Sequence, residues 1–177
     1  MSLLNLRLLG QFQIMSASKP VTAFESDKVR ALLAYLAIEA DRAHSRSSLA
    51  ALLWPDYREE SARANLRHVL HQLRVTTAAS HATGHAAAAT NGAVAAPLFL
   101  SNRQTVQINP ALVTVDVFDF EQRLAACAAH KHTTLHTCDT CLAHLVQASE
   151  LYRGELLAGF GLADSPMFEE WLLTRRE

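Results

Sequence analysis

The stretch from Glu59 to Arg74, with the sequence EESARANLRHVLHQLR, constrains the fold more than any other part of the chain. Apolar residues recur in it at the spacing of a helix that is buried along one side, namely Ala62, Leu66, Val69, Leu70 and Leu73. At 3.6 residues per turn, basic side chains gather on a second face, namely Arg63, Arg67, His71 and Arg74. Such a helix packs one face against a core and presents its arginines outward.

The basic face carries three arginines and no acid. Arginine suits a DNA contact because its planar guanidinium pairs with phosphates or with the O6 and N7 edge of guanine. The alternative is a solvated basic face on an ordinary core helix, which is the better interpretation of any helix taken alone. The residues on both sides of the stretch favour the DNA interpretation.

A short helix and a break precede the basic stretch. Ser45 is placed to cap a helix in which Leu49, Leu52 and Leu53 are buried. Trp54-Pro55-Asp56 ends that helix because proline cannot continue its hydrogen-bond ladder. A short helix, a tight turn and a basic amphipathic helix form a helix-turn-helix pattern, whose second helix enters the major groove of DNA.

Short strands and a further helix are expected before this pattern. Apolar and polar residues alternate over 4–8 and again over 11–14, and residues 20–24 form a third candidate strand. Ser26 then resembles the cap of a helix. Its inward residues are Val29, Leu32, Leu33 and Leu36.

Two different segments follow the basic stretch. Residues 76–96 have almost no charge and little apolar bulk, so we expect a mobile insertion rich in Ala and His. A continued alanine helix is the alternative, which Gly84 and Gly92 weaken. Residues 98–108 alternate again around the turn Ser101-Asn102-Arg103-Gln104, which predicts a hairpin. A hairpin after a recognition helix is the wing of a winged helix.

Three more helices are expected after residue 112, over about 116–129, over about 139–152 and from Ser165-Pro166 onward. The third is still amphipathic at the last residue, so we expect a fragment of a longer protein. The expected inward residues are Val117, Phe120 and Leu124 in the first helix, Leu142, Leu145, Val146 and Ser149 in the second, and Phe168, Trp171 and Leu172 in the third.

Charge is divided unevenly along a chain whose net charge is −1. Residues 1–76 carry ten Lys and Arg against seven Asp and Glu, a net of +3, and residues 77–177 carry six against ten, a net of −4. This division suits a DNA-facing module joined to a protein-facing one. The sequence has no signal peptide and no run of eighteen apolar residues, so we expect a soluble, cytoplasmic protein without a membrane partner.

Histidines and cysteines cluster between residues 127 and 144. Cys-x-x-Cys is the spacing at which two thiolates reach one zinc ion, and nearby imidazoles complete a tetrahedron. The candidate ligands of a structural zinc ion are His130, His132, Cys138 and Cys141, with His136, His144 and Cys127 as substitutes. The alternative makes Cys141 a small core residue among surface histidines. A Cys/His nucleophile lacks a recognisable signature here, so we expect no enzyme.

Five sequence motifs together resemble the bacterial antibiotic-regulatory (SARP) type of transcriptional regulator. They are LLGQFQI, FESDKVRALLAYLAIEA, LAALLWPDYREESARANLRHVLHQLR, ASELYRGELLAGF and FEEWLLTRRE. Such regulators join an OmpR-like winged helix to a bacterial transcriptional activator domain (BTAD). The resemblance implies a mainly α fold with small β elements (α+β), with the winged helix at 1–112. It also implies that residues 113–177 begin a truncated activator domain of TPR-like helices.

The resemblance implies a DNA-binding transcriptional regulator of the activator type. Its recognition helix, about 59–75, would enter the major groove, and its wing, 98–108, would meet the adjacent groove or backbone. The DNA-binding residues implied are Arg63, Asn65, Arg67, His71 and Arg74 on the helix, Asn102 and Arg103 on the wing, and Ser45, Arg46 and Ser47 at a phosphate-binding helix N-terminus.

The partners expected are double-stranded DNA and RNA polymerase, with a second copy of the chain as a homodimer or as a tandem neighbour on direct repeats. Larger relatives continue into a nucleotide-binding module, but this chain has no GxxxxGK[ST] loop. The alternative function is a protein–protein interaction or scaffold module of a larger signalling ATPase, in which the winged helix does not read DNA.

Overall fold

The computed structural model describes residues 4–16, 19–82, 96–131 and 138–177. In it, strand β1 (Leu4–Arg7) lies inside a sheet that joins the two ends of the winged helix. The strand order is β3-β2-β1-β7, from β2 (Gln13–Ser16), β3 (Lys19–Pro20) and β7 (Val113–Val115). β1 pairs antiparallel with β2 and parallel with β7. Leu4 and Leu6 are buried while the residues between and after them are not, as the alternation predicts.

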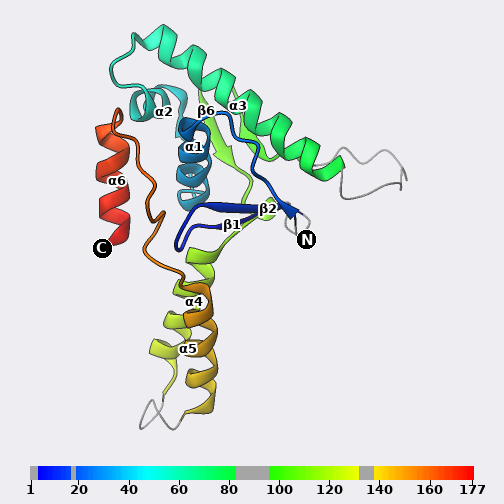
Figure 1. The fold of residues 1–177 in the computed structure, drawn as a ribbon, viewed down its shortest axis with the longest axis vertical. Coiled ribbons are helices and arrows are strands. Elements are labelled where there is room, and N and C mark those ends of the chain that lie inside the picture. The colour runs from blue at the N-terminus through cyan, green and yellow to red at the C-terminus, as the bar shows by residue number, and fades with distance from the viewer. Residues whose placement is uncertain (1–3, 17–18, 83–95, 132–137) are drawn as a thin grey trace.

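Three helices pack together beside this sheet, and the first and third of them contact its strands (Figure 1). They are α1 (Asp27–Ile38), α2 (Arg46–Leu53) and α3 (Glu59–Ala82). The predicted apolar stripe of α3 is buried at every position: Ala62, Leu66, Val69, Leu70 and Leu73. Ser45 caps α2 as expected, because its Oγ accepts the Ser48 N–H at 2.9 Å. The helix-turn-helix pattern is therefore confirmed as local structure.

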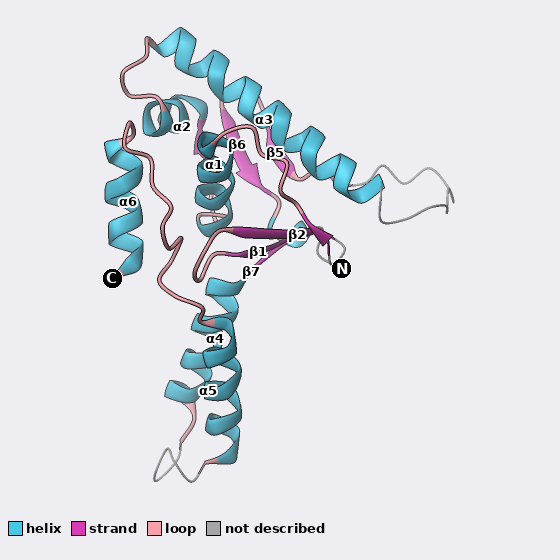
Figure 2. Ribbon diagram, viewed as in Figure 1, coloured by secondary structure: helices cyan, strands magenta, loops and turns pink. Residues whose placement is uncertain are grey.

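The wing forms a second small sheet in the order β4-β6-β5 (Figure 2). It is built from β4 (His44–Ser45), β5 (Phe99–Ser101) and β6 (Thr105–Ile108). Asn102 closes the turn, since its side-chain Oδ1 accepts the N–H groups of Gln104 and Thr105, both at 2.7 Å. A 3-10 turn, η1 (Pro110–Leu112), then leads into β7.

Two boundaries differ from the sequence prediction. The third strand is only Lys19–Pro20, because the chain turns where the Phe24 N–H donates to the Thr22 carbonyl at 2.9 Å. Helix α3 continues to Ala82, so the expected mobile insertion is wrong for residues 76–82, and the alternative of a continued helix holds there. Buried Thr77 supports this extension by donating its hydroxyl to the Leu73 carbonyl at 2.7 Å. Residues 83–95 lie outside the described part.

Helices α4 (Asp116–Ala129) and α5 (Asp139–Leu151) pack together as a hairpin that projects from the sheet (Figure 1). The predicted inward face is wrong at four positions: Leu124 and Leu142 are 39% exposed, Val146 is 56% exposed and Ser149 is exposed. Val117 packs against the core as predicted, and Phe120 and Leu145 are half-buried. The residues buried instead are Cys127 on α4 and Cys141 and Ala148 on α5. These small side chains let two helix backbones approach closely, whereas a leucine face would hold them apart.

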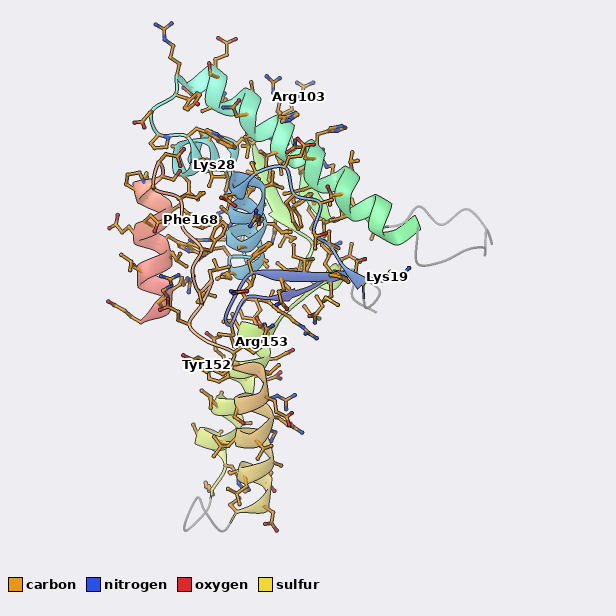
Figure 3. The ribbon with its side chains drawn as sticks, viewed as in Figure 1. Lys19, Lys28, Arg103, Tyr152, Arg153 and Phe168 are labelled. Carbon is orange, nitrogen blue, oxygen red and sulfur yellow. The ribbon has the colours of Figure 1, made fainter. Side chains whose placement is uncertain are left out.

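Helix α6 (Pro166–Arg176) returns to the winged helix and lies beside α1 and α2 (Figure 1). Phe168, which lies between α6 and α1 in Figure 3, is fully buried, and Leu172 is 1% exposed, as predicted. Trp171 Nε1 donates to buried Glu39 at 3.0 Å, and Arg175 pairs with the same carboxylate. The TPR-like array and the domain boundary at 112 stay predictions.

The base of the hairpin is fixed to the sheet from both sides. Buried Asp116, at the start of α4, accepts the N–H groups of Leu8 at 2.7 Å and Leu9 at 3.1 Å. Arg153, after α5, donates to the same carboxylate at 2.9 Å (Figure 3). The Leu157 N–H then donates to the Leu8 carbonyl at 2.7 Å.

No helix of the described ranges has both the length and the apolar character needed to cross a membrane.

Candidate nucleic-acid interface

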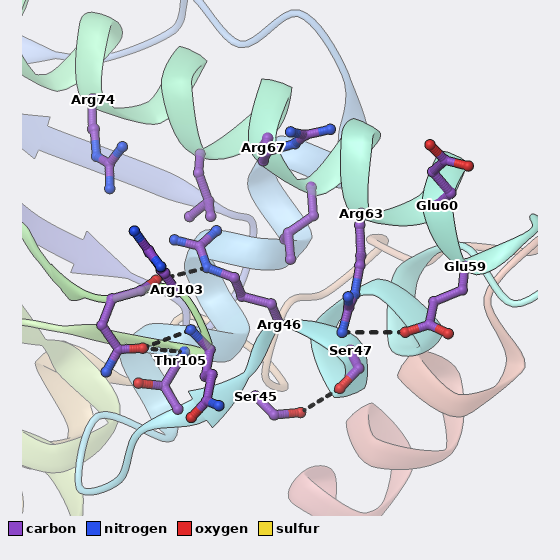
Figure 4. Close-up of a pocket in the computed structure, with 14 residues that line it drawn as sticks. Ser45, Arg46, Ser47, Glu59, Glu60, Arg63, Arg67, Arg74, Arg103 and Thr105 are labelled. Carbon is purple, nitrogen blue, oxygen red and sulfur yellow. Dashed lines mark hydrogen bonds and ion pairs between the residues drawn. The ribbon is translucent and has the colours of Figure 1, made fainter.

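A concave groove of about 1370 Å³ lies between α3, the start of α2 and the wing turn (Figure 4). One wall is the exposed face of α3, and the other is made of 45–47 and 102–105. Leu66 and Leu70 lie at its floor, because both are buried yet still line it. The amphipathic pattern therefore positions the groove, since the stripe that anchors α3 fixes which side chains face outward.

Five arginines from three elements line this groove. They are Arg46 from α2, Arg63, Arg67 and Arg74 from α3, and Arg103 from the wing turn (Figure 4). Burial lowers the pKa of Arg46, and the positive charges of Arg74 and Arg67 lower it further. The guanidinium groups are thus close enough to repel one another, which is a field that an anion would relieve.

Two acids line the groove beside the arginines, whereas the sequence prediction placed no acid on this face. Arg63 pairs with Glu59, one turn earlier on α3, at 3.2 Å, and Glu60 also lines the groove. The pair is exposed on both sides, at 52% and 69%, so it is worth roughly 0.3–0.5 kcal/mol. A phosphate can replace Glu59 at Arg63 for little free energy.

The wing is attached to the helices through arginines. Arg74 donates from Nη2 to Ser101 Oγ at 2.9 Å. Arg46 donates from Nε to the Asn102 carbonyl at 3.0 Å, and its backbone N–H donates to the Gln104 carbonyl at 2.8 Å. Arg67 differs, because its guanidinium has no hydrogen-bond or ion-pair partner among the described residues. Arg67 is therefore the arginine of α3 most available to a ligand.

The structure brings most of the predicted DNA-binding residues together, with two exceptions. Asn65 lies about 200° around α3 from Arg63, half-buried on the opposite flank, and it does not line the groove. His71 is exposed one turn after Arg67 but does not line the groove either. Gln104, which also lines the groove, was not predicted, although its place in the wing turn was a signal.

A second cluster joins the end of α4 to the start of α5. His130 Nδ1 lies 3.2 Å from Cys141 Sγ and 3.3 Å from Cys138 Sγ. These three ligand atoms all lie within 4.8 Å of one another. Burial, followed by hydrogen bonds and charge from Cys138 and Cys127, raises the pKa of the Cys141 thiol to about 11. His132, the fourth predicted ligand, and the substitute His136 lie outside the described residues.

No protein-family model and no curated protein sequence matches this chain. Its structure is similar to that of Mycobacterium tuberculosis EmbR in complex with a low affinity phosphopeptide, with a TM-score of 0.69. The two are 19% identical, and the likeness covers 98% of this chain and 42% of that chain. This comparison shows a shared fold along almost the whole chain, which spans less than half of the solved protein.

Proposed function

We propose that this chain is a sequence-specific DNA-binding transcriptional regulator of the activator type. Helix α3 would enter the major groove, and the wing, 98–108, would meet the adjacent groove or the backbone. The observation that carries the proposal is the convergence of five arginines from α2, α3 and the wing turn on one concave face. The helix-turn-helix and wing also support the proposal, because in a winged helix the second helix of this motif enters the major groove.

The contacts of each arginine support different roles on DNA. Arg67 has an exposed guanidinium with no partner among the described residues, so we assign it to a base edge. Arg46 and Arg74 also hold the wing, and Arg63 is shared with Glu59, so we assign these three to phosphates. We assign Arg103, which lines the groove from the wing turn (Figure 4), to the DNA backbone beside the neighbouring groove.

The rest of the chain would link DNA to the transcription machinery in the cytoplasm. Residues 113–177 would form the first part of the activator domain, with the α4–α5 hairpin as its first helical pair. The hairpin exposes Phe118, Leu124, Leu142 and Val146, a surface suited to a protein partner, which we propose to be RNA polymerase. A second copy of the chain would bind beside the first, as a tandem neighbour or a homodimer.

The test begins with a duplex selected on the purified chain from a random pool, because repeated rounds of binding enrich whichever sequence the protein prefers. Binding is then followed by fluorescence anisotropy at several salt concentrations. Arg67→Ala should weaken binding by about 1–3 kcal/mol and relax the preference at one base pair. Arg63→Ala or Arg103→Ala should weaken all duplexes equally and reduce the salt slope by about 1.

Arg7 provides the matched control, because it is an exposed arginine on β1, outside the groove. Arg7→Ala should leave both affinity and salt slope close to those of the wild type. If selection enriches no sequence, or if Arg67→Ala behaves like Arg7→Ala, the DNA-reading assignment is wrong. The interaction-module alternative, in which the winged helix is a scaffold, would then be the better account.

A further inference from the structure

Three side chains from two helix ends converge at the junction of α4 and α5. His130 is the residue that caps the C-terminus of α4, and Cys138 is the residue that caps the N-terminus of α5. Cys141 lies three residues further along α5, so it shares a side of the helix with Cys138.

The spacing of the three ligand atoms is close to that of a tetrahedral zinc site. With bonds of about 2.3 Å to sulfur and about 2.1 Å to nitrogen, zinc separates its ligand atoms by about 3.6–3.8 Å. The two nitrogen–sulfur distances here are 3.2 and 3.3 Å, and all three atoms lie within 4.8 Å. The two nitrogen–sulfur distances would therefore need to lengthen by only a few tenths of an ångström to admit the ion.

Burial also divides the three ligands in a way that suits ion uptake. Cys141 is fully buried, Cys138 is half-buried and His130 is exposed, so the cluster runs from the interior to the surface. An ion can enter from solvent without opening the hairpin. The third cysteine, Cys127, is buried nearby on α4, but its thiol points to the Cys141 carbonyl, at 3.5 Å, and it is not one of the three clustered ligands.

We propose that His130, Cys138 and Cys141 bind one zinc ion, which fastens the end of α4 to the start of α5. Two thiolates and an imidazole select zinc over the oxygen-preferring Mg²⁺ and Ca²⁺. On binding, each cysteine releases its proton to solvent and His130 is neutral, with Nδ1 toward the metal. A water molecule would fill the fourth position of the tetrahedron. The role is structural, because the ion joins the outer ends of the two helices, whose base is already held by Asp116.

The site is tested on the full chain, purified under reducing conditions and dialysed against buffered zinc. Elemental analysis and native mass spectrometry should find one zinc ion per chain. Cobalt substituted for zinc should give an intense sulfur-to-cobalt absorption, which a nitrogen and oxygen site would not give. Chelation should reduce the hydrogen-exchange protection of α4 and α5 while the protection of α1–α3 stays the same.

The variants separate loss of a ligand from loss of the fold. His130→Ala and Cys138→Ser change residues that are not fully buried, so both should fold, and each should weaken zinc binding roughly 100-fold or more. Cys127→Ser is the matched control: it removes a thiol of the same hairpin and should still bind one ion. Circular dichroism of the metal-free proteins checks that all three variants are folded.

Three outcomes would overturn the proposal. The first is protein without zinc after preparation with excess zinc. The second is unchanged zinc affinity in Cys138→Ser, or an equal loss in Cys127→Ser. The third is a metal-free protein with a disulfide between Cys138 and Cys141, which would assign the pair to redox chemistry. None of these measurements involves DNA, so the site and the proposed regulator function succeed or fail separately.

Discussion

Replacing Asp116 with alanine should destabilise the chain more than any surface substitution on the same helix. The Asp116 carboxylate is buried, at 6% side-chain exposure, and it accepts the backbone N–H groups of Leu8 and Leu9. Alanine removes both acceptors and leaves two amides of buried residues without these bonds. It also leaves the Arg153 guanidinium without its carboxylate.

The magnitude follows from these three contacts. Each buried donor that loses its partner costs about 1–3 kcal/mol. The Arg153 side chain is 33% exposed, so water replaces part of its lost ion pair and the loss there is below about 1 kcal/mol. The sum of these terms is about 2–7 kcal/mol. The usual cost of breaking a buried pair, about 3–5 kcal/mol, lies in the middle of that range, and we take it as the expected loss. With a urea slope of about 2 kcal/mol/M, the unfolding midpoint should fall by about 2 M.

Urea denaturation followed by circular dichroism measures this change. Asp119→Ala is the matched control, since Asp119 is an exposed acid in the first turn of the same helix, and its loss should cost below about 1 kcal/mol. Asp116→Asn should lie between the two, because it keeps one oxygen acceptor and loses the charge. An Asp116→Ala midpoint indistinguishable from that of Asp119→Ala would refute the reasoning.

Two further predictions concern the contact between α1 and α6. Burial raises the pKa of Glu39, but hydrogen bonds from Trp171 and Arg175 and nearby arginine charge outweigh it, so this pKa lies below its ordinary value of 4.5. Glu39 therefore stabilises the folded chain at pH values above 4.5, and this stability is lost as the pH falls through the lowered pKa of the folded state. Urea midpoints measured against pH should fall on the acid side for the wild type, and this fall should be smaller in Glu39→Gln. Trp171→Ala removes the Tyr35 ring contact at 4.9 Å and should cost about 2–3 kcal/mol by thermal unfolding, whereas Leu173→Ala, 60% exposed on α6, should change little.

The elements that the sequence predicts well are those in which one periodic pattern has a single interpretation. Helix α3 has one apolar stripe, which predicts its buried face, and the prediction of the buried face also fixes which side chains form its basic face. In the wing, apolar and polar residues alternate in two segments on either side of a polar turn, and this pattern allows only one interpretation, a β-hairpin. The groove between α3 and the wing could therefore be expected before its shape was known.

The remaining errors have specific physical causes. On α5, the leucine and valine positions and the Cys141–Ala148 positions both recur at helical spacing, and sequence cannot tell which of them meets α4. Glu59 lies four residues before Arg63, which is the spacing of a helical ion pair, so this pair is predictable from the sequence. Asp116 was expected only as a helix start, because its partners are backbone amides about 108 residues away, which leave no sequence signal.

The parallel pairing of β1 with β7 also has a consequence for the time course of synthesis. Asn5 and its sheet neighbour Thr114 are 109 residues apart, so one edge of β1 has no β7 partner until the ribosome has made the rest of the winged helix. At about 5–20 residues per second, that interval lasts roughly 5–20 s. Throughout it, the nascent chain presents an open strand edge, which is the kind of surface on which chains mispair. The sheet is therefore completed, and α4 reaches its final position, only late in the synthesis of the chain.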